Sequence, residues 1–248
     1  MATFVLAPAA LLRPAFGAYD SEAKLQGAVG RALVEYWRSG TSELPAGLTT
    51  LVDYWFAWHA IKVAISASSV IVLALLATAL WHRYLRARGS ATAATAATVV
   101  TVLAVGVLMA NIQATAVPLV ALLPLLSGTT ADGRLAQVVS EIRERLTTSA
   151  DPQAGSGALA VLLSEVARYH WVLAAVSATL LVALGLAGAQ FWKRRTTGGP
   201  GATRVGVMRR TLGVIMILTA CLLLLMTAAS VVSALQPATA LLDALGAG

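Results

Sequence analysis

The chain has 248 residues, of which 58% are hydrophobic and only 12% are charged, and its mean hydropathy is +0.78. A soluble domain of this length could not bury so much apolar surface behind so few charges, so the composition indicates an integral membrane protein. The net charge of +7 would suit a nucleic-acid partner, but the excess lies in two short loops between apolar segments, so we expect no nucleic-acid binding.

The N-terminal part of the chain combines an apolar segment with an amphipathic one. Residues 1–17 read "MATFVLAPAALLRPAFG" and make a poor signal peptide, because prolines and a lone arginine interrupt the apolar run. We interpret them as part of the mature protein, with an apolar strap that begins at Pro8. In residues 18–37 one apolar face follows the helical period, which predicts an amphipathic helix on the outer surface; its members are Leu25, Val29, Ala32 and Tyr36.

Gly40 and Pro45 interrupt the chain after this helix, and Thr50 with Asp53 has the spacing of a capping box for the next one. Apolar runs of about 20 residues suffice to cross roughly 30 Å of hydrocarbon as helices. Four such spans are predicted, at 56–81, 95–117, 172–192 and 212–234.

One loop, 82–94, joins the first and second spans, and another, 193–211, joins the third and fourth. Together they contain nine lysines and arginines and no acidic residue. The positive-inside rule therefore places both loops in the cytoplasm and both ends of the chain outside the plasma membrane. The heavy use of Ala, Leu, Val and Arg is typical of a bacterial chain.

Between the second and third spans the pattern of the N-terminal part returns. An apolar strap begins at Pro118, and residues 131–146 predict a second outer amphipathic helix. Its apolar face consists of Leu135, Val139, Ile142 and Leu146. The helix of the third span should begin near Gly157, and another apolar strap begins at Pro237.

The whole chain therefore reads as two copies of one unit, residues 1–117 and residues 118–248. Rare residues support the alignment at a constant offset of 111, in the pairs His59 and His170, Ser66 and Ser177, and Trp81 and Trp192. Because each copy holds two spans, both insert in the same orientation. We predict an all-α integral membrane protein whose four transmembrane helices form a tandem parallel 2+2 repeat, with amphipathic helices on the outer surface.

Polar side chains recur near the outer ends of the spans. His59, Lys62 and Ser66 share one helix face, and the second copy repeats the face without the lysine. We expect a polar outer vestibule formed by Lys62, Ser66, Asn111, Gln113, Ser177 and Ser230. The same residues also fit a simpler interpretation, in which the histidines and the lysine lie at headgroup level beside a tryptophan belt and the others bond between helices.

Little in the sequence indicates catalysis. The single cysteine, Cys221, lies in the fourth span, and nucleotide-binding, hydrolase and zinc-protease motifs are absent. We therefore expect no catalytic residue, and two histidines are too few for a metal site of their own. His59 and His170 could still hold a haem between two helices, and His59, Lys62 and Asn111 could hold a quinone or a lipid headgroup.

These observations favour a non-catalytic accessory or structural subunit of a membrane complex or homo-oligomer. It would contact membrane lipids and bind a protein partner or a second copy through the outer amphipathic helices. Two alternatives stay open. One is a component of an oligomeric channel or transporter, and the other is an electron-transfer membrane protein that binds haem or quinone through His59 and His170.

Overall fold

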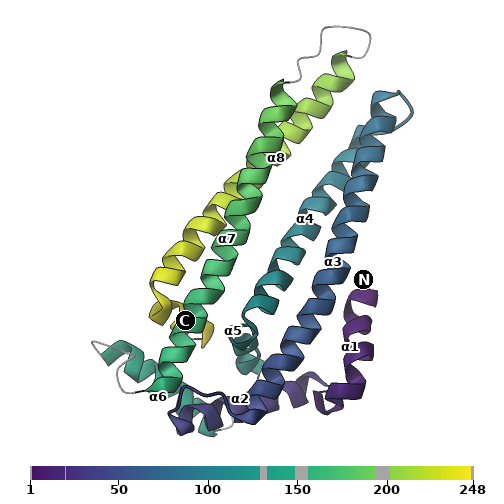
Figure 1. Ribbon diagram of the computed structural model, residues 1–248. Helices are drawn as coiled ribbons and strands as arrows, with labels where there is room; N and C mark the ends of the chain where they lie inside the picture. Colours follow the sequence, from purple (N-terminus) through teal and green to yellow (C-terminus); the bar gives the residue numbers. More distant parts are fainter. Residues whose placement is uncertain (1, 20, 129–132, 149–155, 194–201, 247–248) are drawn as a thin grey trace. The chain divides into compact units, whose positions relative to one another are not determined.

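The computed structural model describes the chain except residues 1, 20, 129–132, 149–155, 194–201 and 247–248 (Figure 1). All regular elements in the described part are helices, which confirms the predicted all-α class. They are α1 (Ala2–Phe16), the 3-10 helix η1 (Gly17–Tyr19), α2 (Glu22–Ser39), α3 (Ala46–Leu85), α4 (Ala91–Ala116), α5 (Pro118–Leu122), the 3-10 helix η2 (Leu123–Gly128), α6 (Gly133–Thr148), α7 (Gly157–Lys193), α8 (Ala202–Leu235) and α9 (Pro237–Ala244).

Four of these helices, α3, α4, α7 and α8, are long and apolar enough to cross a membrane. They contain the four predicted spans except Val117, the last residue of the second span, which follows the end of α4. Only 11% to 17% of the residues in their most apolar windows are buried within the chain, so most of these side chains are available to lipid or to other helices. With 40 residues, α3 is about 60 Å long, twice the hydrocarbon thickness.

The predicted capping box at Thr50 and Asp53 is wrong, because α3 begins one turn earlier. The carbonyl of Pro45 already accepts the bond of the first turn, from the Thr49 N–H at 2.9 Å. The hydroxyl of Thr50 donates instead to the Ala46 carbonyl at 2.9 Å, as threonines inside helices do. The start of α7 at Gly157 agrees with the prediction.

The chain divides into two compact units. The cap unit consists of Met1–Lys62, Asn111–Val172 and Ser230–Gly248, and the span unit consists of Val63–Ala110 and Leu173–Ala229. These units collect parts of the same long helices and do not correspond to the two sequence copies, 1–117 and 118–248. The duplication therefore stays a prediction.

Helices α2 and α6 contribute one buried face each to the core of the cap unit. The predicted face of α2, from Leu25 to Tyr36, is buried as expected. On α6, however, Val138 is buried at 1% exposure, whereas Val139 is only partly buried. Spacings of three and four residues suit a helical face equally well, so the packing partners decided between the two valines.

Polar contacts also fasten α2 to its neighbours within the cap unit. The Trp37 Nε1 donates to Glu141 Oε2 of α6 at 2.9 Å. At its C-terminal end α2 stops at Gly40, whose positive φ of 65° suits glycine. The Gly40 carbonyl accepts from the Gly157 N–H at 3.1 Å, which ties the end of α2 to the start of α7.

The three segments predicted as straps are helical. Pro118 and Pro237 occupy the first positions of α5 and α9, where a residue without an N–H loses no helix bond. Leu122 of α5 and Leu241 of α9 are buried in the core of the cap unit. The first strap begins inside α1, which also includes the residues before Pro8 and contains both Pro8 and Pro14.

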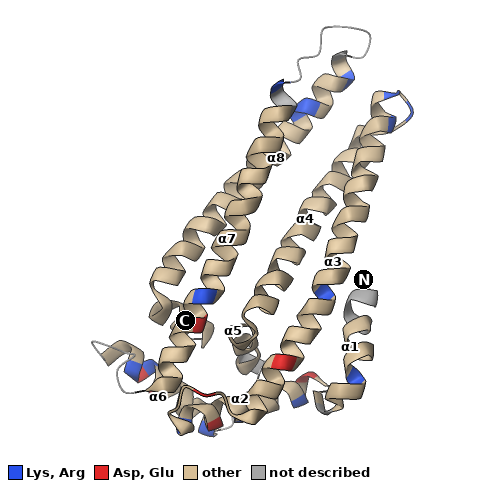
Figure 2. Ribbon diagram, in the orientation of Figure 1, with Lys and Arg blue, Asp and Glu red and all other residues tan. Residues whose placement is uncertain are grey.

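Within the span unit, polar side chains connect neighbouring helices. The Trp81 Nε1 of α3 donates to Thr98 Oγ1 of α4 at 3.0 Å, and the Thr227 hydroxyl of α8 donates to Ser177 Oγ of α7 at 3.0 Å. Figure 2 shows the middle parts of these helices without charged residues and basic residues near the α3–α4 turn. Of the loop at 193–211, residues 194–201 lie outside the described part.

Candidate functional site

His59 lies on α3 against the tryptophan one turn before it. Its Nδ1 is 3.0 Å from the Trp55 carbonyl oxygen, and the two rings are 4.6 Å apart between centroids. When Nδ1 carries the proton and donates to that carbonyl, Nε2 is left as the acceptor or ligating atom. The ring is partly buried.

His170 lies on α7 beside Tyr169, and the two rings meet edge to face with centroids 5.6 Å apart. The backbone here also holds α4, because Gln113 Nε2 donates to the Tyr169 carbonyl at 3.2 Å. Gln113 thus links two long helices inside the cap unit. Haem ligation by the two histidines stays a prediction.

The polar residues of the predicted vestibule are mostly buried. Asn111, Gln113 and Ser230 in the cap unit and Ser66 and Ser177 in the span unit are each at most 7% exposed. The Ser66 hydroxyl donates to the Val63 carbonyl at 3.3 Å, and that of Ser177 donates to the Leu173 carbonyl at 2.6 Å. Because these residues divide between both units, a common vestibule stays a prediction.

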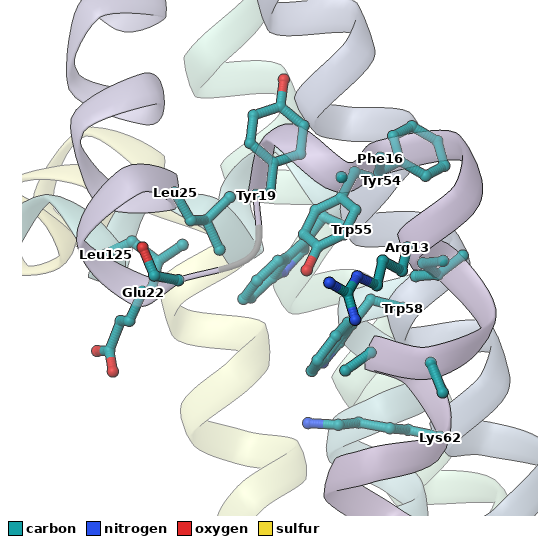
Figure 3. A pocket seen from close by; sticks show the side chains of 15 residues that line it. Arg13, Phe16, Tyr19, Glu22, Leu25, Tyr54, Trp55, Trp58, Lys62 and Leu125 are labelled. Atoms are coloured by element: carbon teal, nitrogen blue, oxygen red, sulfur yellow. The ribbon is translucent and has the colours of Figure 1, made fainter.

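Lys62, the remaining member of that set, lines a pocket of about 830 Å³ in the cap unit. Helix α1, η1 and the start of α2 form one wall of the pocket, and α3 forms another. The Lys62 ammonium lies 5.3 Å from the centre of the Trp58 ring, within cation–π distance. In Figure 3 the side chains of Lys62 and Arg13 extend on either side of Trp58 toward the same opening.

A series of aromatic rings lines this pocket. Tyr54 of α3 contacts Phe16 at 5.4 Å, Tyr19 at 5.1 Å and Trp58 at 5.8 Å between ring centroids. Aromatic pairs at these distances stabilise packing beyond simple area burial. The series therefore attaches α1 and η1 to α3 and holds Arg13 near Lys62.

One polar atom of the pocket wall lacks a bonding partner among the described residues. The indole Nε1 of Trp55 is buried and donates no hydrogen bond there. An unpaired buried N–H costs free energy. The cations of the pocket are Arg13 and Lys62, whereas Glu22 is its single carboxylate.

Sequence reasoning identified Lys62 but missed Arg13 and Tyr54. The signal for Arg13 was present, since it is the only charged residue in the apolar segment 1–17. It lines the same pocket as Lys62 because α1 packs against α3, and helical spacing does not reveal this packing between residues 49 positions apart. Among the described residues, no group of three or more His, Cys, Asp or Glu side chains could hold a metal ion.

Comparisons with known proteins return no relative: no protein-family model, no curated protein and no solved structure matches the chain.

Proposed function

We propose that this chain is a non-catalytic accessory or structural subunit of a membrane complex or homo-oligomer. The observation that carries the proposal is the use of polar side chains as links between helices. Gln113 bonds the backbone at Tyr169, Thr227 bonds Ser177, and Trp81 Nε1 bonds Thr98. Such bonds stabilise helix association in apolar surroundings by about 0.6–2 kcal/mol each.

We also propose an orientation of the chain in the membrane. The basic loops 82–94 and 193–211 lie in the cytoplasm and both ends of the chain lie outside the plasma membrane. The separation of charge along the sequence supports this arrangement. Helices α2 and α6 then lie on the outer side, and the chain consists of two parallel copies, 1–117 and 118–248.

The packing of α2 and α6 limits which of their faces a partner can contact. Their apolar faces are buried in the core of the cap unit, so a partner contacts the opposite, exposed face. On α6 this face includes Ala136, Ser140, Arg143 and Glu144. The exposed apolar sides of the four long helices offer a second surface within the membrane.

Affinity purification in mild detergent, combined with mass measurement of the complex, tests this proposal. We expect a stoichiometric partner or a defined homo-oligomer with the unmodified chain. The double variant Ala136→Arg, Ser140→Arg places two bulky charges on the exposed face of α6 and should lower recovery of the complex at least about tenfold, with helix content unchanged.

The matched control is Ser90→Arg, Ala93→Arg, which adds the same charges to exposed positions in the basic loop 82–94. It should leave recovery of the complex unchanged. A monodisperse monomer without a partner would contradict the subunit role, and equal losses in both variants would contradict docking on α6. An absorption band of haem in the same preparation, lost in His59→Ala and His170→Ala, would favour electron transfer instead.

A further inference from the structure

Beyond the subunit role, we propose that the pocket between α1, η1 and α3 binds the phosphate headgroup of an anionic membrane lipid. The two cations of the pocket carry the argument. Figure 3 shows Arg13 and Lys62 extending toward the same opening with the Trp58 ring between them, whereas the Glu22 carboxylate is directed away. Guanidinium and ammonium groups are the usual partners of phosphate oxygens.

A phosphate diester carries several acceptor oxygens and a single negative charge, so it can accept from both cationic side chains. Donors that converge in this way discriminate against ligands that carry only donors or positive charge.

The rest of the pocket suits a hydrocarbon tail and not a bare ion. Most of its lining is apolar or aromatic, and six apolar members come from the three elements α1, α2 and η2: Ala9, Ala10, Leu12, Phe16, Leu25 and Leu125. Apolar surface of this kind gains free energy by covering hydrocarbon, and a free phosphate ion would leave it exposed. A volume of about 830 Å³ accommodates a headgroup with its glycerol and the first part of a chain.

The position of Lys62 along α3 matches the depth at which lipid phosphates lie. The 20 residues after it, 63–82, contain no Lys, Arg, Asp or Glu, and at 1.5 Å per residue they cover about 30 Å, the hydrocarbon thickness. Lys62 therefore stands at the boundary between hydrocarbon and headgroups. Trp55 and Trp58 lie just before it, as interfacial tryptophans do.

Native mass spectrometry of the full chain, purified in detergent and supplied with equal amounts of phosphatidylglycerol and phosphatidylcholine, tests the proposal. We expect one saturable site that prefers phosphatidylglycerol. The variant Arg13→Gln, Lys62→Gln should weaken this binding about tenfold or more, because charge-assisted hydrogen bonds are lost.

The control variant Arg134→Gln, Arg143→Gln removes two exposed cations of α6 in the same unit and should bind like the unmodified chain. Equal binding in both double variants, or equal binding of both lipids, would overturn the proposal. Glycerol phosphate and inorganic phosphate are added in separate samples. If either binds Arg13 and Lys62 as tightly as the lipid, the ligand is a soluble phosphate and the lipid assignment is wrong.

The lipid assay does not depend on the subunit role, since it measures an adduct on the isolated chain. Loss of a protein partner in the purification experiment would leave the lipid result unchanged, and the reverse holds as well. The two proposals therefore fail separately.

Discussion

At the scale of single residues, His59 and Lys62 stand about one turn apart on α3 but have different surroundings. His59 is held by its own helix, through the Trp55 carbonyl and the Trp55 ring. Lys62 extends into a pocket whose other cation, Arg13, comes from α1. Helical spacing predicts neighbours on one helix reliably, but it carries no information about a neighbour that arrives from another element.

Tyr36 is a second residue whose role appears only in the folded chain. Its side chain is fully buried, and its hydroxyl has no hydrogen-bond partner among the described residues. Burial, and secondarily the Glu165 carboxylate, raises the pKa of the Tyr36 phenol above the ordinary value of 10.0. The native state therefore favours the neutral phenol.

Replacing this residue gives a test. A buried hydroxyl without a partner costs about 1–3 kcal/mol, so Tyr36→Phe should raise the free energy of unfolding by about 1 kcal/mol. In the unmodified chain the free energy of unfolding should be highest below pH 10 and fall as the pH rises above 10 toward the raised pKa. Denaturant unfolding at several alkaline pH values measures both effects.

The control for this measurement is Tyr19→Phe, which changes a partly exposed phenol in the same unit. It should leave the free energy of unfolding at neutral pH nearly unchanged, whereas Tyr36→Phe should raise it and remove part of the alkaline decrease. A less stable Tyr36→Phe variant would show that the hydroxyl has a partner that contributes to folding.

At the scale of elements, the end of α2 and the start of α7 form a tightly packed junction. Gly157 donates its N–H to the Gly40 carbonyl at 3.1 Å. A Cβ on Gly157 would lie 2.7 Å from the Ser42 nitrogen and 3.0 Å from the Thr41 carbonyl carbon. Both neighbours are backbone atoms, so they cannot turn aside as a flexible side chain does. The sequence predicted that α7 begins here. The close approach of the backbone of Thr41 and Ser42 explains why the residue is a glycine.

We therefore expect Gly157→Ala to lower the free energy of unfolding by about 1–3 kcal/mol, as overpacking usually does. Gly47→Ala is the matched control, because it adds the same methyl group to open space near the start of α3. Alanine has the higher helix propensity, so the control should be unchanged or slightly more stable. Thermal unfolding in one detergent compares the two, and an equal response would contradict the close contact at Gly157.

At the scale of the whole molecule, the distribution of charge supports the proposed orientation in the membrane. The middle parts of the long helices lack charged residues (Figure 2). The cap unit, which includes α2 and α6, contains both acidic and basic residues. The lysines and arginines of loops 82–94 and 193–211 have no acidic residue beside them in sequence. Moving such loops across a membrane is costly, so they should stay on the cytoplasmic side.

Cysteine labelling of intact cells tests this orientation. In a Cys221→Ser background, Glu144→Cys on the exposed face of α6 should react with a membrane-impermeant maleimide. Arg88→Cys, in the turn between α3 and α4, should react only after the cells are opened. The opposite pattern would reverse the proposed orientation, and labelling of both positions in intact cells would contradict the single span, α4, between them.

By itself the sequence determined the helical class, four helices long and apolar enough to span a membrane, the break at Gly40 and the buried face of α2. These features depend on local composition and on a period of 3.6 residues, which are properties of one segment at a time. Only the tertiary structure decided that Val138 and not Val139 is fully buried, that Gly157 meets the backbone at Gly40, and that Arg13 joins Lys62. Each of these depends on which distant segment packs alongside, and long-range packing has no fixed spacing in the sequence.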